Sequence, residues 1–338
     1  MIPKIMIILG SASDMDIAEK SMNILEKLEI PYSLKIASAH RTPTLVREIV
    51  SKGSDAGVEV FIGIAGLAAH LPGTIAAYTP RPVIGVPVDV KTNGIDALDS
   101  CVQMPYPSPI ATVGIDRGDN GAILAAQFIG INDAEVRQKV IELRAEYAQK
   151  VIDSNEIVSG LEGKKYLVED FLTREKLNLR NDVEEIDTGV NENADVAIIV
   201  GRHSYLITAK KVSVTLDRLK ITYNMKVVCP IRSNRKFKSY IKSVENSKIF
   251  IGISSNSSQV TGALVGLTDR PVIGVPCTNE LGNEHLLTVV NMPPGVPVAT
   301  VGTNNGRNAA VLAGEILSIK NKNIIELLTK LKDKKINL

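Results

Sequence analysis

A segment that occurs twice most constrains how this 338-residue chain can fold. Residues 81–87 and 270–276 both read Arg-Pro-Val-Ile-Gly-Val-Pro, and the Ala-Thr-Val-Gly segment at 111–114 recurs at 299–302. Matching segments stay 188 to 191 residues apart. That offset has the length of a domain and far exceeds the repeat unit of a solenoid. The sequence therefore predicts a tandem duplication.

Each copy alternates short apolar runs with segments of helical periodicity, a pattern typical of a parallel sheet. In the first copy we expect strands at 4–9, 32–37, 58–64, 82–86 and 110–115. Helices are expected at 14–29, 42–52, 71–78, 95–102, 120–129 and 133–152. We therefore predict two flavodoxin-like three-layer α/β/α domains with parallel sheets, whose ligands bind beyond the carboxyl ends of the strands.

The repeat also sets the expected domain boundaries. The first domain should cover residues 1–152, and the second, which opens on an apolar run at 196–201, should cover 194–338, with 308–319 as its final helix. Residues 153–193 between them are polar and rich in charge, which favours a solvated linker, partly helical at 162–178.

Composition narrows the class of protein. The chain carries 39 Lys and Arg against 37 Asp and Glu, so we expect neither nucleic acid nor a membrane surface as a partner. Its three cysteines lie far apart and form no metal-binding motif, which fits a reducing cytoplasm. We expect neither a signal peptide nor a transmembrane helix, and hence a cytoplasmic protein.

The loop after the first predicted strand, Gly-Ser-Ala-Ser-Asp at 10–14, has two possible interpretations. Backbone N–H groups and hydroxyls at the start of a helix favour a bound phosphate. The same residues would also suit a helix cap, with Ser13 or Asp14 closing the first turn.

Two further strand ends carry histidines. His40 and Arg41 follow the second strand, and His70 follows the third after a run of small residues. A histidine can transfer protons near neutral pH, and an arginine can bind a phosphate through two hydrogen bonds. Each residue alone could be structural, and Thr42 with Pro43 could simply begin the next helix. Together these loops predict a site for a small phosphorylated molecule.

Four segments of the first copy, in their order and spacing, resemble the PurE family of purine biosynthesis. They are residues 10–14, Ser-Ala-His-Arg-Thr-Pro at 38–43, Ala-Gly-Leu-Ala-Ala-His-Leu-Pro-Gly at 65–73 and Val-Gln-Met-Pro at 102–105. The resemblance covers residues 4–150, whereas the second copy resembles the family in its scaffold only. The chain is therefore identified as a tandem PurE protein.

The resemblance implies an enzyme of de novo purine biosynthesis that needs no cofactor and no metal. Its product would be 4-carboxy-5-aminoimidazole ribonucleotide. Mutases of the family move a carboxyl group from N5 to C4 of N5-carboxyaminoimidazole ribonucleotide, and a second class carboxylates aminoimidazole ribonucleotide directly with CO₂. The segment at 68–73 resembles the mutase class. We therefore expect a mutase (an isomerase), with direct carboxylation (a lyase activity) as the alternative.

The resemblance also implies the roles of individual residues. His40 matches the proton-transfer position beside the imidazole of the substrate, and His70, close to the base, is the second expected catalytic residue. Ser11 and Arg41 match phosphate contacts and Asp14 a ribose contact. The remaining expected substrate contacts are Ser13 and Ser38 toward the phosphate, and Ala65, Gly66 and Leu67 along the base and carboxylate.

The second copy departs from this pattern at the positions that carry chemistry. Ile231 stands in place of His40 and Gln259 in place of His70, although Arg232 matches Arg41. An isoleucine cannot transfer a proton, so we predict that this copy is inactive. His203 and His285 match no functional position. An alternative is a regulatory ligand site around Arg202, Ser204 and Arg232.

Single-domain members of the family form octamers, so the resemblance implies a homo-oligomer, in which four tandem chains would mimic eight domains. The long helix at 133–152 would dock on a neighbour. A rival interpretation is a non-catalytic nucleotide-binding protein, against which the intact His40, Arg41 and Ser11 argue.

Overall fold

The structure is a computed structural model that describes residues 2–91, 93–154, 190–255, 259–278 and 284–336. The elements of the first copy are β1 (Ile5–Leu9), η1 (Ala12–Asp14), α1 (Met15–Lys27), β2 (Tyr32–Ile36), α2 (Pro43–Ala56), β3 (Val60–Gly66), α3 (Leu71–Tyr78), β4 (Val83–Val88), α4 (Ile95–Val102), β5 (Ala111–Thr112), α5 (Gly118–Gly130) and α6 (Ala134–Asp153). The predicted order of strands and helices is confirmed.

The second copy repeats this order. Its elements are β6 (Val196–Val200), η2 (His203–Tyr205), α9 (Leu206–Arg218), β7 (Tyr223–Val227), α10 (Asn234–Ser243), β8 (Ile249–Ser254), α11 (Gln259–Val265), β9 (Val272–Pro276), α12 (Glu284–Val290), β10 (Ala299–Thr300), α13 (Gly306–Leu317), η3 (Ser318–Lys320) and α14 (Lys322–Ile336). The helix predicted at 308–319 corresponds to α13 and η3, but the prediction that it is the final helix was wrong, because α14 follows it. Most of the predicted linker, with its helix at 162–178, lies outside the described residues.

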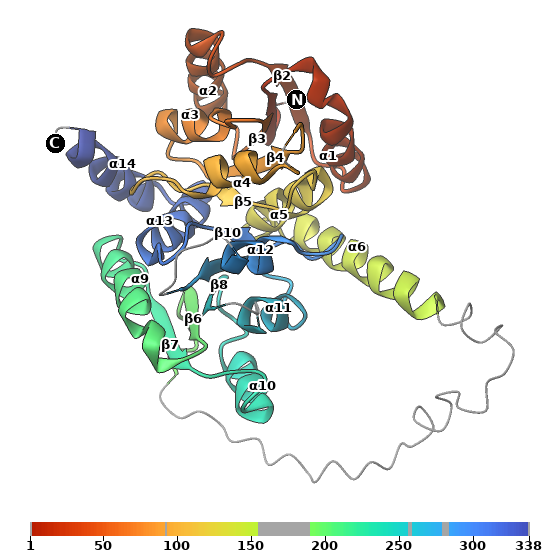
Figure 1. Cartoon of the computed structure of the whole chain (residues 1–338). Coiled ribbons are helices and arrows are strands. Elements are labelled where there is room, and N and C mark those ends of the chain that lie inside the picture. Colours follow the sequence, from red (N-terminus) through yellow and green to blue (C-terminus); the bar gives the residue numbers. More distant parts are fainter. Residues whose placement is uncertain (1, 92, 155–189, 256–258, 279–283, 337–338) are drawn as a thin grey trace, which may run out of the picture.

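The ten strands of the described residues form one sheet in the order β2-β1-β3-β4-β5-β10-β9-β8-β6-β7. Within each copy the strands are parallel and follow the flavodoxin-like order. The copies meet where Thr112 pairs with Thr300, and this pair is antiparallel. The two predicted parallel sheets are thus joined edge to edge (Figure 1).

Burial explains the strand sequences. The residues of β1 and β4 are buried throughout, as expected for inner strands covered on both faces, whereas β2 and β7 at the outer edges are only partly buried. On one face of the sheet a single hydrophobic core runs through both copies under α1, α5, α9 and α13. On the other face each copy has its own core, and a small cluster from α4 and α12 lies between them.

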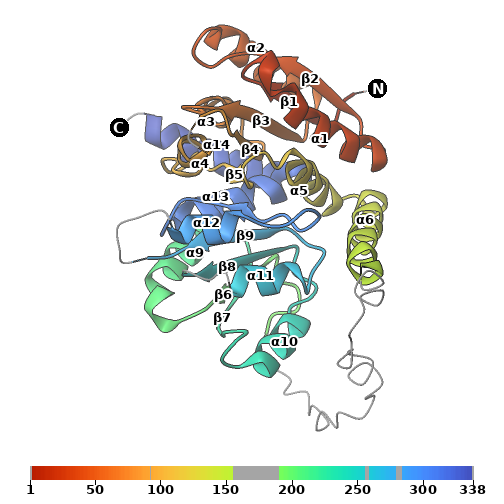
Figure 2. The same ribbon diagram turned by 45° about the vertical axis from the view of Figure 1, so that its right-hand side comes forward.

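The last helix of each copy crosses to the other copy, and the contacts are reciprocal (Figure 2). Arg144 of α6 donates hydrogen bonds to the carbonyl oxygens of Val265 and Thr268. Lys332, the equivalent residue of α14, donates to those of Ala76 and Thr79 (3.3 and 2.9 Å), which are the equivalent positions of the first copy. The neighbour on which 133–152 docks is therefore the other half of the same chain.

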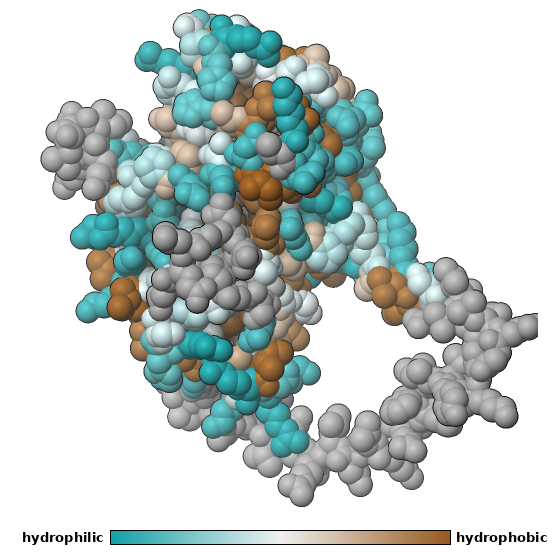
Figure 3. Space-filling model, in the orientation of Figure 1, coloured by the Kyte–Doolittle hydropathy of each residue, from teal (hydrophilic) through white to brown (hydrophobic). Residues whose placement is uncertain are grey.

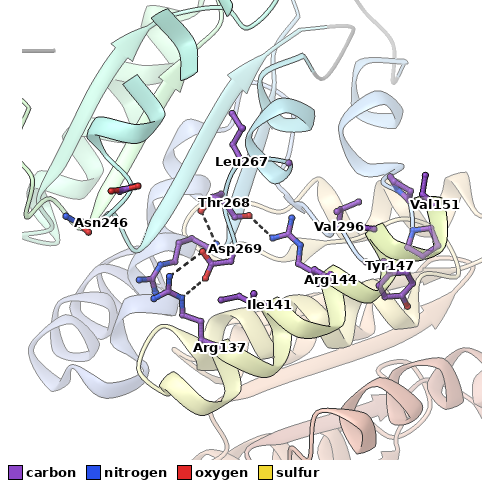
Figure 4. A pocket seen from close by; sticks show the side chains of 18 residues that line it. Arg137, Ile141, Arg144, Tyr147, Val151, Asn246, Leu267, Thr268, Asp269 and Val296 are labelled. Atoms are coloured by element: carbon purple, nitrogen blue, oxygen red, sulfur yellow. Dashed lines mark hydrogen bonds and ion pairs between the residues drawn. The ribbon is translucent and has the colours of Figure 1, made fainter. Parts of the chain in front are cut away.

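Further contacts strengthen this interface. Arg137 of α6 forms an ion pair with Asp269 beside the Arg144 contacts (Figure 4). Asn120 Nδ2 donates to the carbonyl of Pro293 (3.0 Å), and its equivalent Asn308 donates to that of Met104 (2.9 Å). The two copies are thus related by an approximate two-fold axis.

Candidate functional site

A cavity of about 510 Å³ opens at the carboxyl edge of the first copy, where β1, β2 and β3 end. This is the place where parallel α/β sheets bind ligands. All ten residues singled out from the sequence line it: Ser11, Ser13, Asp14, Ser38, His40, Arg41, Ala65, Gly66, Leu67 and His70. The structure thus brings together three loops that are up to 60 residues apart in the chain.

The first two loops form the polar end of the cavity. Ser11 caps η1 by accepting a hydrogen bond from the backbone N–H of Ser13 (3.3 Å). Arg41 Nη2 donates to the carbonyl of Gly10 (3.2 Å), which places the guanidinium beside the start of η1. Hydroxyls, a helix start and a guanidinium converge here, and this combination suits a phosphate. The prediction of a cap by Ser13 or Asp14 was wrong, because Ser11 forms the cap and Asp14, the N-cap residue of α1, makes no side-chain cap hydrogen bond. Phosphate binding by residues 10–14 stays a prediction.

The turn that presents Arg41 is held by its own side chains. The backbone N–H of Arg41 donates to Ser38 Oγ (3.2 Å), and the N–H of Ser38 donates to Thr42 Oγ1 (2.9 Å). Thr42 is the N-cap residue of α2 with Pro43 in the first turn, as predicted, but its hydroxyl bonds back to the carbonyl of Ser38 (3.2 Å) and makes no cap hydrogen bond.

Asp14 is a buried carboxylate in the lining of the cavity. Burial raises the pKa of its carboxyl above the ordinary value, and a hydrogen bond from the Ser13 hydroxyl (3.0 Å) opposes that shift. A carboxylate in this position can accept hydrogen bonds from the hydroxyl groups of a sugar.

The two histidines meet at the other end of the cavity. Their rings are stacked with centroids 5.8 Å apart and planes 23° apart. His40 comes from the turn after β2, and His70 is the N-cap residue of α3. Imidazole is a common general acid–base group in enzymes, so the pair gives the cavity two candidate groups for proton transfer.

The third loop forms a wall of small residues. A Cβ on Gly66 would lie 2.4 Å from Val90 Cγ2 and 3.2 Å from the carbonyl oxygen of Val88, so glycine is needed for the close approach of β4. Leu67 has a φ of 56°, a backbone conformation that is unusual for a leucine. Val90, after β4, also lines the cavity, and the sequence analysis missed it because no polar residue marks that strand end.

A second cavity of about 720 Å³ adjoins the first and shares His40 and His70 with it. Its far wall includes Gln103, Met104 and Tyr78. The stacked imidazoles therefore line both cavities. Leu67 and Val90, which line the first cavity, are about half exposed. Hydrophobic residues gather on the upper part of the face drawn in Figure 3.

The second copy keeps the frame of the site without its histidines. Arg232 Nη2 donates to the carbonyl of Gly201 (2.7 Å), which repeats the Arg41 contact. Ile231, in place of His40, is 71% exposed, and Gln259 stands in place of His70. His203 is exposed on η2, and the side chain of His285 lies outside the described residues.

In the part of the chain that the structure describes, every helix is too short or too polar to span a lipid bilayer. Within the same residues, no group of three or more His, Cys, Asp or Glu side chains is placed to hold a metal ion.

The fold and the cavity define a flavodoxin-like α/β protein with a polar cavity at the carboxyl edge of its sheet. Its sequence matches the family model described as AIR carboxylase twice, over residues 4–150 and 195–337. The chain belongs to this family and carries two of its domains in tandem.

Curated relatives include proteins of both lengths. A "Probable N5-carboxyaminoimidazole ribonucleotide mutase" of Methanobrevibacter smithii is 68% identical over the whole of both chains. One of the same name from Methanothermobacter thermautotrophicus is 49% identical over 99% of each chain. The "N5-carboxyaminoimidazole ribonucleotide mutase" of Methanocaldococcus jannaschii is 55% identical over 46% of this chain and 98% of its own length.

Proposed function

We propose that the first copy is an N5-carboxyaminoimidazole ribonucleotide mutase of purine biosynthesis, which forms 4-carboxy-5-aminoimidazole ribonucleotide. The stacked His40–His70 pair carries this proposal, because it lies in one cavity with the phosphate-compatible end formed by Ser11 and Arg41. The mutases that are 68% and 49% identical over nearly the whole chain support it.

The polar end of the cavity would bind the part of the substrate that does not react. Arg41 and the hydroxyls of Ser11, Ser13 and Ser38 would hold the phosphate, and Asp14 would accept hydrogen bonds from the ribose. This remote binding energy can be used to hold the imidazole in position. The base would then lie against the small residues Ala65 and Gly66, beside the histidines.

The reaction requires one bond to break and one to form. The bond between N5 and the carboxyl carbon breaks, CO₂ is released, and N5 becomes an amine by gaining a proton. C4 then attacks the CO₂, and the proton that C4 carries must leave. His40 would take that proton, and the proton count is unchanged overall, as an isomerisation requires. A site shielded from water keeps the CO₂ beside C4.

The variant His40→Asn tests the assignment of the proton-transfer group. Asparagine keeps hydrogen-bonding capacity but has no titratable group, so turnover should fall at least about a hundredfold. Substrate binding, measured by equilibrium dialysis, should change little. His203→Asn, on the exposed η2 of the second copy, is the matched control. Near-normal turnover of His40→Asn would contradict the assignment.

A paired assay separates the mutase from the direct carboxylase. The alternative has a named relative, a "Phosphoribosylaminoimidazole carboxylase" of Candida glabrata that is 40% identical over 49% of this chain. One arm supplies N5-carboxyaminoimidazole ribonucleotide without bicarbonate, and the other supplies aminoimidazole ribonucleotide with bicarbonate. We expect efficient product formation only in the first arm. Efficient product formation at modest bicarbonate in the second arm would establish a carboxylase instead.

The second copy would then act through packing and not through this reaction, since Ile231 and Gln259 replace both histidines. The reciprocal contacts of α6 and α14 make one chain resemble a dimer of single domains. We further propose a cytoplasmic homotetramer, which would match an octamer of single domains. Sedimentation equilibrium should give four times the chain mass, and a monomer would contradict this.

A further inference from the structure

The carboxyl edge of the second copy keeps the geometry of a ligand site although it has lost the groups for proton transfer. The register of β6 and β7 repeats that of β1 and β2, and Arg232 reaches the carbonyl of Gly201 as Arg41 reaches that of Gly10. Ser233 Oγ donates to the carbonyl of Cys229 (3.2 Å), as Thr42 donates to that of Ser38. The turn that presents the arginine is therefore preserved.

The charge at this edge has changed in one direction. Arg202 stands in place of Ser11, and Tyr205 stands in place of the buried carboxylate Asp14. The Tyr205 ring is partly buried and packs against the main core, so it does not restore a negative group. The edge has thus gained a guanidinium and lost a carboxylate, which favours an anion more strongly than in the first copy.

A buried hydroxyl at the same edge has no partner among the residues that the structure describes. Ser254 ends β8 and is only 5% exposed, and its Oγ makes no hydrogen bond to any of those residues. It occupies the position of Ala65, whose methyl group lines the cavity of the first copy. Distances to the preceding strand support this equivalence of Ser254 and Ala65. A Cβ added at Gly201 would lie 3.7 Å from the Cβ of Ser254, and a Cβ added at Gly10 would lie 3.5 Å from the Cβ of Ala65. A buried hydroxyl without a partner is costly, so a ligand atom is the expected partner.

The thiol of Cys229 lies beside the turn that presents Arg232, with its Sγ 3.6 Å from Oε1 of Gln259. Cys229 is buried, and burial by itself would raise the pKa of its thiol. The backbone N–H groups of Arg232 and Ile231 together with the Arg232 guanidinium outweigh burial and lower that pKa. Groups that stabilise a thiolate at this point would also stabilise an anionic ligand.

We infer that the second copy holds a binding site of its own for a small phosphomonoester, in which Arg232 and Arg202 bind the phosphate and the hydroxyl of Ser254 binds the remainder of the ligand. The site binds without catalysing, since it has no histidine in the positions of His40 and His70. The inference rests on the equivalence of the two copies and stands apart from the activity of the first.

Binding stoichiometry on the full chain tests this inference. Radiolabelled ribose 5-phosphate in equilibrium dialysis should give two sites per wild-type chain, one in Arg41→Ala and one in Arg232→Ala. Ser254→Ala should weaken the second site about tenfold, as expected for a hydrogen bond to a charged or polar ligand atom. This variant places the alanine of the first copy at the same position, so folding should be unaffected. Arg218→Ala, at the far end of α9, is the control for removing an exposed arginine.

The outcomes are distinguishable. A single wild-type site that Arg41→Ala removes and Arg232→Ala leaves intact would overturn the inference. Two sites that Arg232→Ala leaves unchanged would overturn it as well, with circular dichroism confirming that the variant is folded. A single site that only Arg232→Ala and Ser254→Ala affect would support the second site and count against phosphate binding by the first copy.

Discussion

Glu315 is a buried carboxylate at the interface between the copies, and its neutralisation should stabilise the chain at alkaline pH. The residue lies on α13 and is 1% exposed, and it forms an ion pair with Lys332, 2.9 Å away. Burial raises the pKa of its carboxyl from 4.5 to about 7, although Lys332 opposes the shift. The folded chain therefore holds a proton that the unfolded chain releases between pH 4.5 and 7.

The sign and size of the effect follow from this difference. Because the pKa is higher in the folded state, the free energy of unfolding falls as pH rises through this window. A difference of about 2.5 units at about 1.4 kcal/mol per unit gives a loss of about 3 kcal/mol at pH 8. Glu315→Gln removes this loss. Gln127, the equivalent residue of the first copy, shows that an amide fits, since it donates to the carbonyl of Asp269 (3.1 Å).

Urea unfolding of the full chain at pH 5 and pH 8 measures the effect. Glu315→Gln should match the wild type within about 1 kcal/mol at pH 5 and exceed it by about 2 to 3 kcal/mol at pH 8. Glu326→Gln, exposed on α14, should change stability equally at both pH values. If Glu315→Gln were less stable than the wild type at pH 8, the ion pair with Lys332 would be net stabilising and the reasoning would be refuted.

Substitutions at a glycine and at two interface cations test the packing. Gly118→Ala should lower the free energy of unfolding by about 3 kcal/mol, because its Cβ would lie 2.2 Å from the carbonyl oxygen of Ile17. Gly266→Ala is the control in the same urea assay, since the nearest atom to its Cβ would be 3.6 Å away. Arg144→Met should lower the free energy of unfolding by about 2 to 4 kcal/mol, because two carbonyls of the other copy lose their donor. Lys332→Met should give a loss of similar size, measured by thermal unfolding. A change below about 0.5 kcal/mol in both variants would contradict the reciprocal interface.

The sequence predicted most of the fold because the inner strands are short apolar runs closed by glycine or proline. The helices at Leu71–Tyr78 and Ile95–Val102 have the predicted bounds. The join between the sheets could not be predicted, since β5 and β10 have only two residues each and pairing across the copies leaves no local pattern. Helix α14 was missed because a lysine-rich segment indicates a solvated tail as readily as a docked helix.

The site could be assembled from the sequence because parallel strands bring their carboxyl ends to one edge of the sheet. Ser11, His40 and His70 each follow such an end, and all three line one cavity. Val90 and the second cavity could not be found in this way, because they depend on how closely β4 approaches Gly66 and on residues with no chemical signature.

The pairing of β5 with β10 also sets the order of events during synthesis. Thr112 is synthesised 188 residues before its pairing partner Thr300, so until then β5 has a neighbouring strand only on its β4 side. At the rate of translation this takes about 10 to 40 s. For that interval the nascent first copy exposes an unpaired strand edge and the docking face of α6 to other chains on the same messenger. Fusing the two copies makes the correct partner arrive on the same polypeptide, at a high local concentration, as soon as it is made.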